Sequence, residues 1–143
     1  MAADHKLRAE EQSEAEVSCA DVTTGEARYL MALLDMGTVD GAPSQAALAR
    51  HLGVSAPTAL EMLRRLRSLG LVDDAEVRLT PRGTSAAIVL TSRRNAAYAI
   101  LTDVLGLEGD QAEVEAAWLA ASASPLLGRH LIAWRTHAGD ARG

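Results

Sequence analysis

Residues 44–71, SQAALARHLGVSAPTALEMLRRLRSLGL, decide the fold of this chain. Apolar residues at helical spacing predict a first short helix that ends at Leu52. The turn is Gly53-Val54-Ser55, because glycine accepts the positive φ that follows a helix and serine caps the next helix. Leucines then recur every third residue over 60–69, and Gly70 ends this second helix. Two helices joined in this way form a helix-turn-helix, whose second helix is built to enter a DNA major groove.

Charge is distributed unevenly along the 143 residues, which carry a net charge of −5. Residues 1–22 carry −4, residues 23–43 carry −2 and residues 95–143 carry −3, whereas residues 44–94 carry +4 from eight arginines and four acids. The helix-turn-helix therefore lies in the net basic segment, as contact with phosphates requires. The alternative interpretation is that these arginines only solvate a helix face.

Composition argues against several classes of protein. No apolar run approaches the roughly 20 residues that a membrane helix needs, and no signal peptide is visible. The single cysteine, Cys19, cannot form an intrachain disulfide, which suits a reducing cytoplasm. The sequence has no glycine-rich phosphate loop, no paired histidines at metal spacing and no nucleophile with a visible base, so we do not expect an enzyme.

The segments around the helix-turn-helix predict a winged DNA-binding domain over residues 23–80. Thr23-Thr24 caps a helix that Gly37 ends. Residues 71–79 predict a short hairpin, the wing, with strands at 71–72 and 77–79 and a turn at 73–76. Residues 1–22, which precede this domain, are polar and acidic, and we expect a flexible tail there.

After the wing, the sequence predicts an all-helical domain over residues 81–137. Thr80-Pro81 starts a long helix that runs to about Leu105. Two further helices follow, from Asp110 or Gln111 to about Ala121 and from Leu126 to about His137, and residues 138–143 are predicted to be a tail. The fold class is therefore mainly α: a winged helix-turn-helix followed by an all-helical dimerisation domain.

These last helices are rich in alanine and leucine, and they exceed what a small DNA-binding module needs. Helices this apolar predict burial of one face against a second copy of the chain. A two-fold homodimer would present two recognition helices to a palindromic operator. The expected partners are thus double-stranded DNA and a second copy, with no membrane.

The predicted DNA contacts fall on the helix-turn-helix and the wing. Ser55, Pro57 and Thr58 open the recognition helix, where base edges are reached. Glu61, one turn further on, can accept a hydrogen bond from a cytosine amino group. The candidate phosphate contacts position the protein without specifying sequence. They are Gln45, Arg50, Arg64, Arg65, Arg67 and, on the wing, Arg78, with Arg64 or Arg65 favoured among the neighbouring arginines.

The order and spacing of several motifs resemble the diphtheria-toxin-repressor family, which includes iron- and manganese-dependent regulators of the DtxR and MntR types. The motifs are Thr23-Thr24 with Tyr29-Leu30, Pro43, Ser55-x-Pro57-Thr58, Gly70-Leu71-Val72, Thr80-Pro81-x-Gly83 and Leu101-Thr102-Asp103-x-x-Gly106-Leu107. The resemblance covers about residues 23–132. It implies a repressor of the two-domain layout without an SH3-like domain, in which Ser55, Pro57 and Thr58 match positions that touch the operator.

The sequence departs from this family where the resemblance implies a regulatory metal, between the first helix and the dimerisation domain. Ligands are expected just before Tyr29, on the long helix and beside Trp118, but these positions hold Arg28, Arg94, Tyr98 and the run 116–121, AAWLAA. Arginine stays protonated, and alanine and leucine offer no donor atom. We therefore predict a metal-independent relative with no cofactor. Arg28 and Arg94 are expected to meet an acid such as Glu113 or Glu115, or an anionic ligand.

Other interpretations stay open. Some winged helices pair subunits without touching DNA, and the acidic wing favours such a module. The regulator is alternatively switched by an organic ligand or by a metal held through atypical residues. His5 and Cys19 match no known ligand spacing. His51 is interpreted as a solvent or phosphate contact, and His130 and His137 as surface residues.

Overall fold

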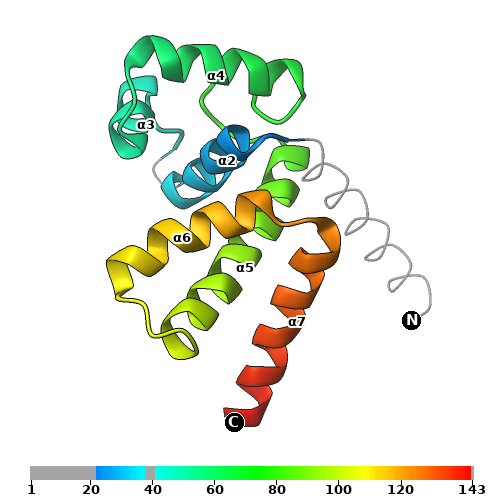
Figure 1. The fold of residues 1–143 in the computed structure, drawn as a ribbon. Coiled ribbons are helices and arrows are strands. Elements are labelled where there is room, and N and C mark those ends of the chain that lie inside the picture. Colours follow the sequence, from blue (N-terminus) through cyan, green and yellow to red (C-terminus); the bar gives the residue numbers. More distant parts are fainter. Residues whose placement is uncertain (1–21, 38–40, 143) are drawn as a thin grey trace, which may run out of the picture.

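The computed structural model describes residues 22–37 and 41–142. The predicted acidic tail, with His5 and Cys19, thus lies almost entirely outside the described residues. Six helices fill the described part of the chain (Figure 1). They are α2 (Thr24–Met36), α3 (Gln45–Leu52), α4 (Ala56–Ser68), α5 (Pro81–Asp103), α6 (Gly109–Ser122) and α7 (Pro125–Arg142). The predicted fold class, mainly α with a winged helix-turn-helix before further helices, is confirmed.

Helix starts follow the capping residues of the sequence. The Thr23 side chain accepts from the Glu26 N–H, and the Glu26 carboxylate accepts from the Thr23 N–H, which completes a capping box. Ser44, Ser55 and Thr80 each accept the N–H three residues on. Each of these caps satisfies a backbone donor that the helix leaves unpaired, so the starts of α2 to α5 are fixed locally.

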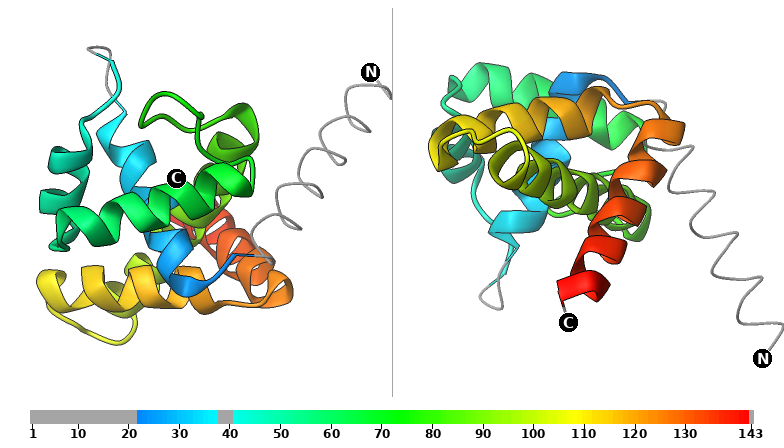
Figure 2. Two further views of the ribbon diagram at one scale, coloured as in Figure 1. Left: turned by 90° about the horizontal axis from the view of Figure 1, so that it is seen from above. Right: turned by 60° about the horizontal axis from the view of Figure 1, so that its bottom comes forward.

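The turn between α3 and α4 has the predicted geometry. Gly53 takes φ 67°, in the left-handed region that favours glycine. Behind the turn, Leu48, Leu63 and Leu66 are buried with Leu30 of α2 in one apolar core. Figure 2 shows α4 as the outer element on this side of the molecule, lying over α2. The core therefore holds one face of α4 and leaves the other to solvent.

The predicted wing is present as a loop, but the prediction of two strands within it is wrong. The described chain has a single antiparallel bridge here, between Val72 and Leu79, and no strand. The Asp73 N–H donates to the Arg78 carbonyl at 2.8 Å. Segments of two and three residues closed by a four-residue turn leave room for only one such pairing. The Asp73 carboxylate accepts from the Ala75 and Glu76 N–H groups, and these hydrogen bonds lower the pKa of Asp73.

The glycine of Thr80-Pro81-x-Gly83 is explained by close packing. A Cβ atom at Gly83 would lie 1.9 Å from the Leu71 carbonyl oxygen, on rigid backbone. The first turn of α5 therefore approaches the start of the wing as only glycine permits. This contact fixes the direction in which α5 leaves the winged helix-turn-helix.

Helices α5, α6 and α7 form the second half of the molecule, with α2 between them and α4 (Figure 1). Alanines occupy the closest positions, since Ala96, Ala97, Ala112 and Ala116 are fully buried. Helix α7 extends to Arg142, beyond the predicted end at about His137, so the segment predicted as a tail at 138–143 is helical through Arg142. None of the helices in residues 22–37 and 41–142 is long and apolar enough to cross a membrane.

Candidate nucleic-acid interface and the junction beneath it

The exposed face of α4 carries most of the predicted base-reading residues. Ser55, Pro57, Thr58 and Glu61 are all exposed. The Ser55 hydroxyl accepts the Thr58 N–H and donates to the Thr58 hydroxyl at 2.8 Å, so these two side chains are oriented before any ligand arrives. Pro57, Glu61 and Arg64 follow at positions i, i+4 and i+7 and form one solvent-facing stripe.

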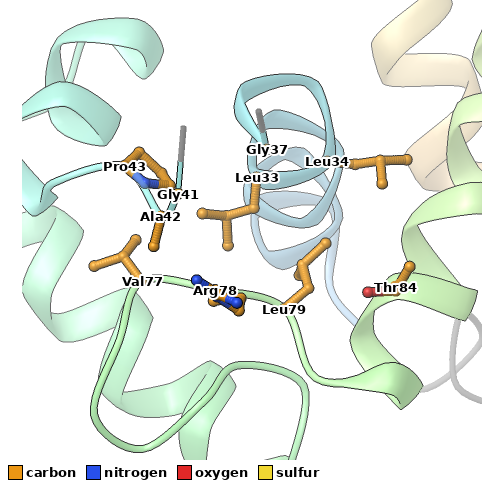
Figure 3. A pocket seen from close by; sticks show the side chains of 10 residues that line it. All are labelled: Leu33, Leu34, Gly37, Gly41, Ala42, Pro43, Val77, Arg78, Leu79 and Thr84. Carbon is orange, nitrogen blue, oxygen red and sulfur yellow. The ribbon is translucent and has the colours of Figure 1, made fainter. Parts of the chain in front are cut away.

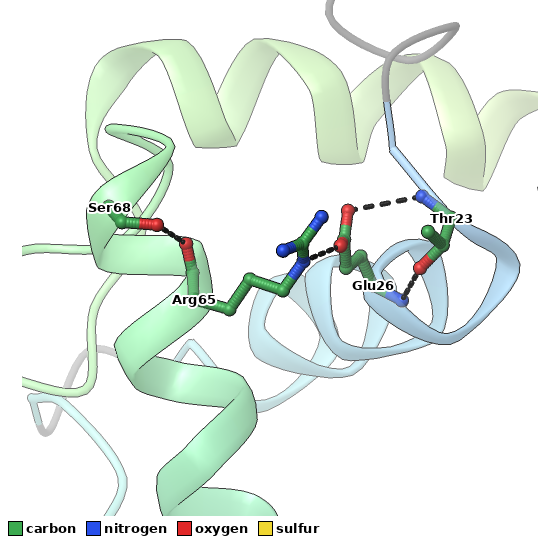
Figure 4. A network of polar contacts seen from close by, with 4 residues as sticks. All are labelled: Thr23, Glu26, Arg65 and Ser68. Atoms are coloured by element: carbon green, nitrogen blue, oxygen red, sulfur yellow. Dashed lines mark hydrogen bonds and ion pairs between the residues drawn. The ribbon is translucent and has the colours of Figure 1, made fainter.

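The two arginines favoured as phosphate contacts have different surroundings. Arg64 is exposed and forms no ion pair with another residue of the described chain. The Nε of Arg65 instead donates to the carboxylate of Glu26, a side chain that is only 1% exposed (Figure 4). Arg65 therefore fastens α4 to the first turn of α2, and Arg64 is left for an external anion.

Two further arginines, one at the end of α4 and one on the wing, are also engaged. The Arg67 Nε donates to the Asp73 carbonyl at 2.8 Å, which ties the wing to the end of α4. Arg78 pairs with Glu76 at 3.2 Å on the surface and lines a cavity of about 420 Å³ between α2, the wing and α5 (Figure 3). Sequence reasoning missed this bracing role of Arg67, because the carbonyl that it contacts belongs to a turn whose path the sequence does not specify.

The two predicted contacts on α3 lie at opposite ends of that helix. Gln45 is half-buried in the first turn and Arg50 is exposed in the last turn. Arg50, like Arg64, forms no ion pair with another described residue. The described interface thus presents two uncompensated arginines and one polar stripe on α4.

A second hollow lies where α2 and α3 meet the C-terminal helices. Two adjoining cavities of about 360 and 430 Å³ share Asp35, Arg94, Glu113 and Ala117, and we call them together the junction groove. Arg28 and Met31 of α2, His51 and Leu52 of α3, and Val114 and Trp118 of α6 line the first cavity. Tyr98 lines the second.

Burial raises the pKa of the Tyr29 hydroxyl, and the neighbouring Arg28 charge opposes that rise.

An ion pair spans the middle of the junction groove. The Arg94 guanidinium donates two hydrogen bonds to the Asp35 carboxylate, at 3.0 and 3.1 Å, and so links α5 to α2. Arg94 therefore meets an acid, as expected, but the acid is Asp35 of the facing helix and not Glu113 or Glu115. His51 also lines the groove, and it is exposed to solvent.

Asp35, His51 and Glu113 line the groove, but they do not come together as a set of three ligands for a transition-metal ion. No group of three histidine, cysteine, aspartate or glutamate side chains that could hold a metal occurs in residues 22–37 and 41–142. The Asp35 carboxylate already binds a guanidinium, and Ala116 and Ala117 offer no ligand atom. A cation placed here would also face Arg28 and Arg94.

Comparisons with known proteins agree with this architecture. Residues 21–78 match the protein family described as iron dependent repressor, N-terminal DNA binding domain. The diphtheria toxin repressor of Corynebacterium glutamicum is 31% identical over 83 residues, which are 56% of this chain and 36% of that protein. The chain thus spans little more than a third of this curated relative.

Solved structures extend the likeness beyond the matched family domain. A manganese-dependent transcriptional repressor, solved in complex with manganese, is 32% identical with a TM-score of 0.65, covering 75% of this chain and 50% of that one. The manganese regulator SloR shares the fold, with a TM-score of 0.69 at 24% identity over 78% of this chain and 53% of that chain. The predicted resemblance to the diphtheria-toxin-repressor family is confirmed.

Proposed function

We propose, from this resemblance to iron- and manganese-dependent repressors, that the chain is a sequence-specific DNA-binding transcriptional regulator that does not depend on the family metal. The observation that carries the proposal is the surface of α4. It combines an ordered N-terminal turn at Ser55–Thr58, an exposed stripe through Glu61 and the uncompensated charge of Arg64. Such a surface offers both base-reading and phosphate-binding groups.

Roles within the interface follow from the contacts. Thr58 and Glu61 read base edges, while Arg50 and Arg64 bind phosphates. Arg65 and Arg67 act mainly as braces, because their Nε atoms are already bonded to Glu26 and to the Asp73 carbonyl. Arg78 contributes less than Arg64, since Glu76 neutralises it and the wing carries three acids.

Metal independence is supported by the Arg94–Asp35 ion pair. It joins α2 and α5 with two charge-assisted hydrogen bonds, at the junction where the resemblance implies a metal. The DNA-binding helices are thus linked to the C-terminal helices by two side chains of the protein itself, without a bound ion. An organic effector in the junction groove is the alternative mode of control.

Self-association is proposed through the C-terminal helices. Val104 and Leu105 at the end of α5 are 64% and 62% exposed, and Leu126 of α7 is 60% exposed. Exposed large apolar side chains that adjoin each other, as Val104 and Leu105 do, favour a contact surface at the end of α5. A homodimer formed there would present two copies of α4 to a palindromic operator in the cytoplasm, where a regulator of transcription acts.

The proposal is tested by the binding of purified protein to fragments of its own promoter region at two salt concentrations. Arg64→Ala is expected to weaken binding to all fragments equally and to flatten the salt dependence, whereas Thr58→Ala and Glu61→Gln change the preference among fragments. Failure of the unaltered protein to bind any fragment, at low salt as well, would favour a winged-helix interaction module instead.

A further inference from the structure

We propose that the junction groove binds a free amino acid with an apolar side chain. Charge supports this ligand class. Arg94 and Asp35 satisfy each other, but two more charged side chains face the groove, Arg28 from α2 and Glu113 from α6. Both are exposed, and neither forms a hydrogen bond or ion pair with the other or with another described residue. A small zwitterion complements both charges at once, with its carboxylate at Arg28 and its ammonium group at Glu113.

Apolar side chains line the same cavity as these two charges. Val114 and Trp118 of α6 line the same cavity and are 59% and 52% exposed. Met31 of α2 and Leu52 of α3 face them from the DNA-binding side. An apolar or aromatic side chain laid against the Trp118 indole covers this surface and adds ring contacts.

The size of the cavity limits the ligand further. The cavity that holds Arg28, Glu113 and Trp118 measures about 360 Å³, near the lower end of the range of roughly 300–1,000 Å³ for ligand sites. This volume accommodates a single amino acid. The ligand class is thus set by two opposite charges, one apolar face and a small cavity.

Occupancy of the groove has a consequence for DNA binding, which rests on the proposed function. The lining comes from α2 and α3 on one side and from α6 on the other. A ligand that touches both sides binds best to one relative placement of the two halves, and it shifts the population towards that placement. The amino acid therefore acts as an effector that changes operator affinity.

The site is tested without DNA by titrating the full chain with three probes and following tryptophan fluorescence. Trp134→Phe makes Trp118 the sole tryptophan reporter. The probes are phenylalanine, 3-phenylpropionate, which lacks the ammonium group, and phenethylamine, which lacks the carboxylate. Phenylalanine is expected to change the Trp118 emission saturably, and loss of either charged group weakens binding roughly tenfold.

Variants assign the charges to their partners. Arg28→Gln removes the advantage of phenylalanine over phenethylamine, and Glu113→Gln removes its advantage over 3-phenylpropionate. Arg129→Gln on α7 and Glu115→Gln on α6, neither of which lines the groove, leave all three titrations unchanged. The proposal is overturned if phenylalanine produces no saturable change, or if the two truncated probes bind as tightly as phenylalanine.

The two proposals fail separately. A saturable phenylalanine response in a protein that binds no promoter fragment leaves the site standing and refutes the regulator. Promoter binding without a phenylalanine response leaves the regulator standing and refutes the amino-acid site.

Discussion

Replacement of Arg65 by alanine separates bracing of the recognition helix from phosphate binding. In the folded protein Glu26 is 1% exposed and accepts from two donors, the Arg65 Nε and the Thr23 N–H. Arg65→Ala leaves this buried carboxylate with the backbone donor alone. A hydrogen bond to a charged group contributes about 1.5–3 kcal/mol. Water reaches part of the site, because the Arg65 side chain is 59% exposed. We therefore expect a loss of about 1–2 kcal/mol in the free energy of unfolding.

Thermal unfolding measures this loss, and Arg64→Ala is the matched control. For a chain of this length, the Arg65→Ala loss lowers Tm by roughly 3–8 °C. Arg64→Ala changes stability by less than about 0.5 kcal/mol, because that side chain contacts solvent. In DNA binding, Arg64→Ala has the larger effect of the two variants. Arg64→Ala reduces the salt slope by about one for each phosphate that the arginine no longer neutralises, and Arg65→Ala leaves the slope nearly unchanged.

A double-mutant cycle completes the test. Glu26→Gln removes the charge that Arg65 neutralises, so the two substitutions together cost less than the sum of their separate effects, by about 1 kcal/mol. Additive effects of Glu26→Gln and Arg65→Ala, or equal stability of Arg64→Ala and Arg65→Ala, would refute the bracing role.

Four further predictions concern packing, the junction, self-association and pH. Gly83→Ala places a Cβ atom 1.9 Å from the Leu71 oxygen and is expected to destabilise the protein by at least about 1–3 kcal/mol in denaturant unfolding, whereas Gly139→Ala, with open space around it, does not. Asp35→Asn breaks the pair with Arg94 and lowers the free energy of unfolding by about 1 kcal/mol. DNA binding by this variant stays unresponsive to manganese. Leu105→Glu shifts sedimentation towards the monomer, and an unchanged sedimentation coefficient would argue against the proposed surface. The lowered pKa of Asp73 means that its support of the wing is complete above its ordinary value of 3.8 and is lost as the pH falls below it. Intrinsic amide exchange itself slows in acid, so the measured quantity is the protection factor. The protection factors of the Ala75 and Glu76 amides should fall in acid, more than that of the Ala47 amide.

Local signals made the helical framework predictable. Thr23, Ser44, Ser55 and Thr80 each act within three residues of themselves, so the sequence alone indicates where their helices start. The positive φ of Gly53 is equally local, because glycine is the residue that occupies it without strain. The prediction of strands in the wing was wrong because a strand needs several consecutive residue pairs, and here only Val72 and Leu79 pair.

Long-range pairing was beyond sequence reasoning. Arg64 and Arg65 are neighbours of the same type, and only the position of Glu26, 39 residues away from Arg65, separates their roles. Asp35 and Arg94 are 59 residues apart, so neither nearness in sequence nor the position of the next helix identifies Asp35 as the partner of Arg94. The departure of Arg28, Arg94 and Tyr98 from the family pattern was visible in the sequence, and the structure brings these three residues to one groove.

The central claim is that a regulator of this fold binds DNA without the family metal. Its most direct test is the anisotropy of a labelled promoter fragment titrated with purified protein, first in excess chelator and then with manganese, iron or zinc added to the chelator-free protein. We predict binding in chelator with a Kd that the metals leave unchanged. Binding that is lost in chelator, or that any of the metals tightens tenfold or more, equivalent to about 1.4 kcal/mol, would contradict this claim.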